Sequence, residues 1–247
     1  MKNLVIAAVL AASLTAAGGA SAATVYFENF DGYAPAANNA QTAGVSSTST
    51  NSFTTQYNYR TGASNTGANS MYDEGTWTIG TNPLAVHNLW TNVAGSNNML
   101  ILNGDTSPPA MDWLSNSFAV TAGAYTYSFQ LMNVCCNING PVNTPSTLVF
   151  KFTDDAGTIY NLASGPVTSL TTPGVFFTQT GGFNLASNGT LQVALFDSTG
   201  AASGNDFAVD NIRVAFVPEP MTWALMIMGF AGVGATLRRR RGAVAFA

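Results

Sequence analysis

The strongest constraint on this chain is an alternation of apolar and polar residues that runs from Thr24 to Phe216 without a helical stripe. In the segment 125–131 every second residue is aromatic or aliphatic, and the segments 148–152, 191–195 and 212–216 repeat the pattern. A period of two places successive side chains on opposite faces, so each segment predicts a half-buried strand. About eight to ten such segments, separated by turn residues, predict an all-β fold, an antiparallel β-sandwich of jelly-roll type.

Size and composition allow one folded domain. The chain has 247 residues, of which 47% are apolar and 8% are charged. This is enough apolar material for one core, which we assign to residues 23–216. Within it, residues 34–70 are rich in Asn, Ala, Thr, Ser and Gly, so we expect a long flexible loop or a loosely packed flap there.

The charge distribution argues against nucleic-acid binding. Five of the eight basic residues lie in the two end segments, and residues 23–217 hold eleven acidic side chains against three basic ones. Such a surface repels phosphate backbones, which need clustered Lys and Arg. Soluble cations and neutral sugars are compatible with it.

The N-terminus has the three parts of a secretory signal peptide in the expected order. Lys2 precedes the apolar run 4–10, and Ala20-Ser21-Ala22 fits a small-residue cleavage site. We therefore expect residues 1–22 to be a signal peptide that directs export by the Sec machinery and is removed after Ala22.

The C-terminal segment, residues 217–247, has the features of a membrane anchor. After Pro218, Glu219 and Pro220, residues 221–237 contain no charge and precede an arginine cluster at 238–241. A helix of this length spans roughly 25 Å, which is slightly short of a hydrocarbon core. The positive-inside rule keeps the arginines cytoplasmic, so the sequence predicts a single transmembrane helix at 221–237 with residues 23–217 on the far side.

This segment resembles the PEP-CTERM sorting signal in both order and spacing. The matching residues are Pro218, Glu219, Pro220, Trp223, Ala224, Arg238, Arg239, Arg240 and Arg241. The resemblance implies recognition by an exosortase, a membrane-embedded transpeptidase, after a stage as an inner-membrane intermediate. It also implies transfer to the cell surface or extracellular matrix of a Gram-negative bacterium that makes exopolysaccharide. An ordinary permanent tail anchor is the alternative.

From about Met71 to Phe216 the chain is similar to the jelly-roll domains of PEP-CTERM proteins, which are related to galactose-binding-like and carbohydrate-binding modules. The residues that carry this similarity are Tyr72–Thr76, Asn82-Pro83, His87, Met99–Gly104, Trp113 and Ala202–Ile212. Val209 and Asn211 stand where Leu and Asp are frequent. The similarity implies a binding or matrix role and names no ligand.

Three carboxylates are candidate ligands for a structural calcium ion, although no cofactor is required. They are Glu28, Asp31 and Asp210. Calcium prefers oxygen ligands, and the resemblance implies that the first and last strands pair, which would bring Glu28 close to Asp210. The alternative is that all three are solvated carboxylates that cap turns.

Sugar binding needs exposed aromatic rings beside amide groups, and the candidates are Trp77, Trp90, Trp113 and Asn103. Core packing is the alternative role for each tryptophan.

The sequence offers little for nucleophilic catalysis. His87 is the only histidine, no Gly-x-Ser-x-Gly motif is present, and we expect a structural role for His87. Cys135 and Cys136 are adjacent, and an exported protein would oxidise them to a vicinal disulfide or to intermolecular bridges.

These features favour a non-enzymatic surface or biofilm-matrix protein with carbohydrate binding, whose partners are an exosortase, the Sec machinery, the membrane and exopolysaccharide. A secreted polysaccharide hydrolase and a purely structural matrix component are the alternatives.

Overall fold

A computed structural model describes residues 22–33, 53–93, 97–107, 110–136, 148–153, 155, 157, 159–162, 173–197, 204–218, 226–235 and 238. The chain divides into two compact units, residues 24–215 and the two terminal segments 1–23 and 216–247. Each unit is described by itself.

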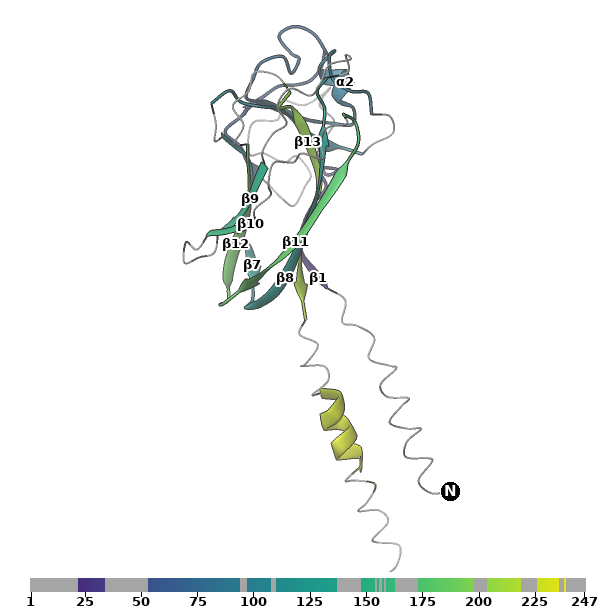
Figure 1. The fold of residues 1–247 in the computed structure, drawn as a ribbon, viewed down its shortest axis with the longest axis vertical. Coiled ribbons are helices and arrows are strands. Elements are labelled where there is room, and N and C mark those ends of the chain that lie inside the picture. The colour runs from purple at the N-terminus through teal and green to yellow at the C-terminus, as the bar shows by residue number, and fades with distance from the viewer. Residues whose placement is uncertain are drawn as a thin grey trace, which may run out of the picture. The chain divides into compact units, whose positions relative to one another are not determined.

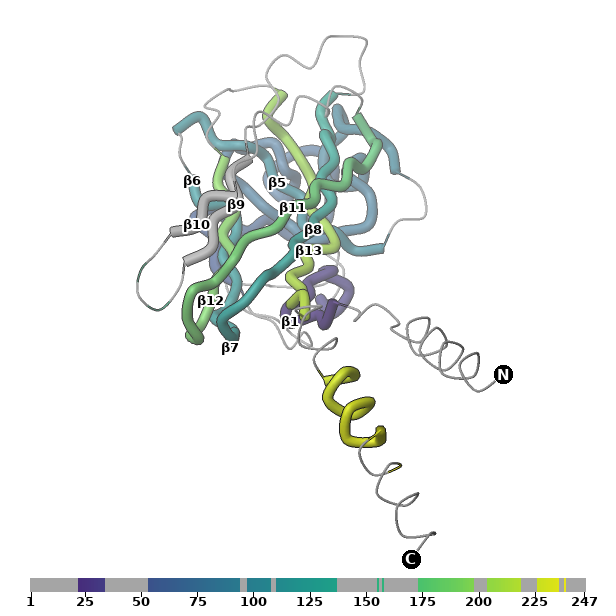
Figure 2. Tube along the Cα trace, turned by 60° about the horizontal axis from the view of Figure 1, so that its bottom comes forward, coloured from purple at the N-terminus to yellow at the C-terminus, as the bar shows by residue number. Residues whose placement is uncertain are grey.

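The larger unit contains two β-sheets (Figure 1). The seven-stranded sheet has the order β11-β8-β13-β5-β4-β3, with β1 paired to β13. Its strands are β1 (Ala23–Glu28), β3 (Asn58–Tyr59), β4 (Thr76–Gly80), β5 (Met99–Asn103), β8 (Gly123–Asn133), β11 (Phe177–Leu185) and β13 (Phe207–Val217). Figure 2 shows β11, β8 and β13 side by side.

The six-stranded sheet has the order β10-β9-β12-β6-β2, with β7 paired to β12. Its strands are β2 (Phe53–Thr54), β6 (Ala110–Ser115), β7 (Phe118–Val120), β9 (Leu148–Thr153), β10 (Ile159–Leu162) and β12 (Gly189–Asp197). The unit also contains a short helix, α2 (Pro83–Val86), capped by the Asn82 side chain, which accepts a hydrogen bond from the Leu84 amide.

Aromatic side chains fill the space between the two sheets. The ring of Phe53 from β2 meets that of Trp77 from β4 at a centroid distance of 5.2 Å, and it lies 6.5 Å from the ring of Trp113 on β6. Because Phe53 and Trp113 come from one sheet and Trp77 from the other, the sheets pack face to face. The predicted β-sandwich is therefore confirmed.

One strand pairing departs from the predicted arrangement, and another agrees with it. Strands β3 and β4 pair in parallel, so the predicted antiparallel arrangement does not hold for this pair. The pairing of the first and last strands, β1 and β13, is present as expected.

The predicted loop at residues 34–70 needs correction over its second half. Residues 34–52 lie outside the described residues, but residues 53–70 include β2 and β3. Phe53 and Tyr57 are each only 3% exposed. These two rings anchor the segment to the core, which a count of polar residues did not reveal.

The terminal unit is described in part. Residues 226–235 form a helix, whereas residues 1–21, 219–225, 236–237 and 239–247 lie outside the described residues. The predicted signal peptide and most of the predicted sorting motif, including Glu219, Pro220, Trp223, Ala224 and three of the arginines, therefore fall outside them. No helix among the described residues is both long and apolar enough to cross a membrane.

Candidate functional site

The three tryptophans proposed from the sequence as a sugar platform are core residues. Trp77 is 1% exposed, and Trp90 and Trp113 are fully buried. Asn103 is also buried, and its amide donates a hydrogen bond to the Met71 carbonyl. Since a buried ring offers no face to a sugar, these four residues cannot form the predicted surface site, and core packing accounts for the tryptophans.

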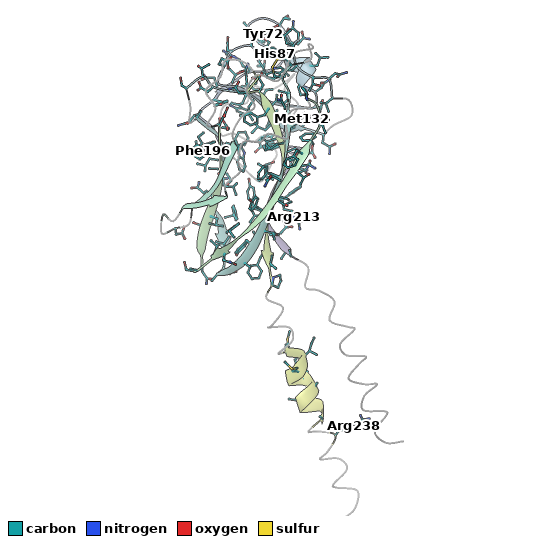
Figure 3. All side chains as sticks on the ribbon, in the orientation of Figure 1. Tyr72, His87, Met132, Phe196, Arg213 and Arg238 are labelled. Atoms are coloured by element: carbon teal, nitrogen blue, oxygen red, sulfur yellow. A yellow bond between two sulfur atoms is a disulfide. The ribbon has the colours of Figure 1, made fainter. Side chains whose placement is uncertain are left out.

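A different aromatic residue is exposed at the end of the sandwich that carries α2. Tyr72 is 40% exposed, and its ring centroid lies 4.2 Å from that of His87. His87 in turn stacks on Trp90 at 4.6 Å with an interplanar angle of 18°. We call these three rings the aromatic column, and Figure 3 shows Tyr72 and His87 together at this end.

The inner end of the column is fixed by hydrogen bonds. Trp90 Nε1 donates to Asp206 Oδ2 at 2.9 Å, and the Trp90 amide donates to the His87 carbonyl. A satisfied indole N–H lets Trp90 be fully buried without an unpaired polar group. The column therefore has a rigid base just before strand β13.

His87 serves the column as a packing residue. Its Nδ1 accepts a hydrogen bond from the Leu89 amide at 3.2 Å, and burial lowers its pKa to about 4. The imidazole is therefore neutral at ordinary pH, and it contacts both the Tyr72 ring, which is tilted by 37°, and the Trp90 ring, on which it stacks. This arrangement supports the structural role expected for His87.

A vicinal disulfide lies beneath the column. The structure joins Cys135 to Cys136, and Cys135 forms an isolated β-bridge with Trp90. Cys135 belongs to the same buried cluster as Met71, Val86 and Trp90. The bridge adds a covalent constraint to the loop that supports the column.

The outer end of the column has the chemistry of a sugar platform. The Tyr72 hydroxyl donates a hydrogen bond to the exposed side-chain amide of Asn88, so the ring has an amide group at its edge. An exposed aromatic face packs against the apolar face of a sugar ring, while amides bond its hydroxyls. The sequence analysis did not propose Tyr72 as a sugar-binding residue, because it lies in the irregular segment before β4, where no periodicity distinguishes an exposed ring from a buried one.

The three candidate calcium ligands lie close enough together for their charges to interact. The pKa of Asp210 is raised to about 7, chiefly by burial and also by the nearby Asp31 and Glu28 carboxylates, while the Asn211 amide opposes the shift. Within the described residues, the non-glycine positions with positive φ are Phe30 at 56° and Asn211 at 53°, and both adjoin these carboxylates.

The same three carboxylates already accept local hydrogen bonds. Glu28 Oε1 accepts from the Phe30 amide at 2.7 Å, Asp31 Oδ1 from the Asn98 amide, and Asp210 Oδ1 from the Asn211 amide. Among the described residues no group of three or more His, Cys, Asp or Glu side chains is spaced to hold a metal ion. Glu28, Asp31 and Asp210 therefore do not form a metal-spaced group in this structure, and their local hydrogen bonds fit the turn-capping interpretation.

A second group of carboxylates lies near the base of the column, and no motif in the sequence pointed to it. Burial raises the pKa of Asp206 to about 6. Asp112 sits where the pairing register of β6 and β12 shifts, is fully buried, and has a pKa raised by burial and by Asp197. Glu74 is exposed, and its pKa is raised to about 7 by partial burial and by Asp206 and Asp105.

Comparison with known proteins gives structural neighbours only. No protein-family profile matches the chain, and no curated protein matches it. The chain is similar to the CBM22-1 xylan-binding domain from Paenibacillus barcinonensis, with 14% identity, 61% of this chain and 92% of that chain covered, and a TM-score of 0.35.

Two further structural neighbours are a second carbohydrate-binding module and an enzyme. CBM35 from Cellvibrio japonicus has 21% identity, with 56% of this chain and 80% of that chain covered and a TM-score of 0.34. A Stig cyclase from Fischerella sp. TAU has 14% identity, with 80% and 99% covered and a TM-score of 0.39. At such low TM-scores, these similarities assign neither a ligand nor an activity to this chain.

The substitution Asp210→Asn tests the electrostatics of the first carboxylate group. The folded-state pKa of about 7 lies above the usual value, so the folded protein binds the proton more tightly than the unfolded chain. Wild-type stability should therefore fall as pH rises from about 4 to about 7, and the variant should lack this contribution. In thermal unfolding, the Tm of the wild type minus that of the variant should decrease across this window. A difference that stays constant with pH would contradict the assignment.

Proposed function

We propose that this chain is an exported, non-enzymatic surface or extracellular-matrix protein of a Gram-negative bacterium whose β-sandwich binds a carbohydrate at Tyr72. The observation that carries the binding proposal is the aromatic column, in which two buried rings hold a third, 40% exposed ring at the surface. A ring that is already held in place loses little conformational freedom when it binds, so even one stacking contact supports measurable affinity.

The neighbourhood of Tyr72 suits a neutral sugar. Asn88 presents a side-chain amide at the edge of the ring, and Arg60 is paired with Asp73, so no free cation of the described residues adjoins it. Amides and neutral hydroxyls make hydrogen bonds to sugar hydroxyls without a requirement for charge. The Tyr72 surface should therefore prefer uncharged sugar rings.

Sorting by an exosortase is the second part of the proposal. It is supported by the order Pro218-Glu219-Pro220, Trp223-Ala224, an uncharged stretch and the arginine cluster. The N-terminal charge, apolar run and small-residue site support export by Sec before that step. Together these signals would carry the sandwich through the inner membrane and on to the cell surface.

A polysaccharide hydrolase is the second candidate, and Glu74 is the observation in its favour. A carboxyl group with a pKa of about 7 beside two other carboxylates has the property required of a general acid at neutral pH. Binding is preferred because Glu74 is an exposed side chain. A glycan that is recovered intact after incubation with the protein supports binding, and a shortened glycan supports hydrolysis.

Replacement of Tyr72 by alanine should weaken glycan binding by about five- to tenfold, because the stacking face is lost. Tyr72→Trp should retain binding, and Phe27→Ala, which removes another exposed ring, should leave it unchanged. A glycan array probed with the full-length chain, followed by calorimetry on the best neutral oligosaccharide, measures the effect. If the protein retains no glycan but still self-associates, a structural matrix role is supported instead. If the glycan is cleaved, the hydrolase is supported.

Calcium enters the proposal as a structural ion whose binding would draw Glu28, Asp31 and Asp210 together and offset the repulsion among these carboxylates. Millimolar calcium should then raise the Tm of the wild type above its value in a chelator, because an ion that binds the folded state stabilises it. Asp210→Asn should abolish most of that rise. An equal Tm with calcium and with chelator would leave the turn-capping interpretation for all three side chains.

Mass spectrometry of protein from the cell surface and medium tests the sorting step. In a host with its exosortase, the recovered chain should begin after Ala22 and lack the segment that follows Pro220. In a host without the exosortase, the C-terminal segment should remain. An intact C-terminus in both hosts would show that the helix is a permanent anchor and would remove the processing claim.

A further inference from the structure

A second surface with ligand-binding character crosses the outer face of the seven-stranded sheet. It is a groove of about 400 Å³ that runs over β8, β11 and β13 and is lined by Thr126, Ser128, Thr180 and Arg213, among others. We call it the sheet groove. Figure 3 shows Arg213 well away from Tyr72 along the sandwich, so the two surfaces are separate.

The strand alternation explains why this face is polar. On β8, Tyr125 and Phe129 are 2% exposed and lie between the sheets, so Thr126 and Ser128 point the other way. On β13, Val214 is buried whereas Arg213 is exposed. The groove is therefore on the solvent side of the sheet, and the hydroxyls of Thr126, Ser128 and Thr180 are among the groups that line it.

A glycine lies directly opposite Thr126, one of the residues that line the groove. Gly182 on β11 pairs with Thr126 on β8 and faces the same side. It carries no side chain, so β11 places no side chain directly opposite Thr126. A built Cβ there would come within 3.1 Å of the Tyr125 carbonyl, so even alanine would fit tightly.

Arg213 gives the groove a positive charge in a domain that has only three basic residues against eleven acidic ones. Its Nε donates to the Thr24 hydroxyl at 2.8 Å, which positions the guanidinium. The salt bridge found among the described residues joins Arg60 to Asp73, so no carboxylate in that part of the chain pairs with Arg213. A guanidinium fork is shaped to bind a carboxylate through two parallel hydrogen bonds.

We propose that the sheet groove binds an acidic saccharide, with a uronate carboxylate on Arg213 and the sugar hydroxyls on Thr126, Ser128 and Thr180. A single arginine in a row of hydroxyls matches a glycan that carries a carboxylate among neutral hydroxyl groups. The eleven acidic side chains of residues 23–217 disfavour polymers of densely spaced phosphates. This proposal adds a second, charge-selective surface to the proposed carbohydrate-binding function. It rests on the proposed function in one respect, that the ligand is a carbohydrate.

The test compares trigalacturonate with its methyl ester, which keeps the sugar rings but removes the charge. Calorimetry with the purified full-length chain should give about tenfold tighter binding of the acid, a preference that shrinks as salt is added. Arg213→Gln should abolish the preference. Arg60→Gln removes the same charge from a residue outside the groove and should keep it.

Equal affinity for acid and ester in the wild type, or a preference that survives Arg213→Gln, would overturn the proposal. Arg213 is exposed, so the variant should unfold at the wild-type temperature, and a Tm measurement verifies that it is folded. Tyr72→Ala should leave the acid preference intact. Failure of the Tyr72 site and failure of the sheet groove therefore give different results in the same set of titrations.

Discussion

The larger sheet depends on strand β13, because β8, β5 and β1 all pair with it. Residues 207–209 pair with β5 and are buried, and the backbone then takes a left-handed conformation at Asn211. A non-glycine residue in this region costs free energy and persists only where its surroundings enforce it. Here the Asn211 side chain is held by Gln130 on the neighbouring strand and by Asp210. The strand thereby sets the positions of three features: Asp206 at the base of the aromatic column, Asp210 beside Glu28, and Arg213 in the sheet groove.

Buried carboxylates are the second constraint. Five carboxylates are at most 8% exposed in a chain with few charges: Glu28, Asp112, Asp197, Asp206 and Asp210. Burial without a cationic partner favours the protonated form, which is why the pKa values of Asp112, Asp206 and Asp210 are raised. A sandwich built in this way is more stable when these carboxyl groups are protonated. Its free energy of unfolding should therefore depend on pH more strongly than that of a sandwich with a purely apolar core.

The sequence predicted the parts of the fold that repeat with a period of two. The strands expected at 125–131, 191–195 and 212–216 are found in β8, β12 and β13, and a two-sheet sandwich follows from them. Isolated contacts between distant segments were not predictable. Phe53 and Tyr57 lie in a polar stretch, and only the fold shows that they reach the core. The same limit applies to the site. Residue type alone did not show that Trp90 is buried and that Tyr72 is exposed, although both rings contact His87.

Two weak surfaces on one domain can hold a polymer more firmly than either surface alone. After one site is occupied, the next part of the same chain is presented to the other at a high effective concentration, and the combined affinity rises without any new contact. Such an increase requires that the polymer be long enough to reach both sites, since Tyr72 and Arg213 lie well apart along the sandwich. A short oligosaccharide would occupy one surface and dissociate readily. A polysaccharide with neutral and acidic sugars would be retained, and this dependence on length is the physical property that a matrix-binding domain needs.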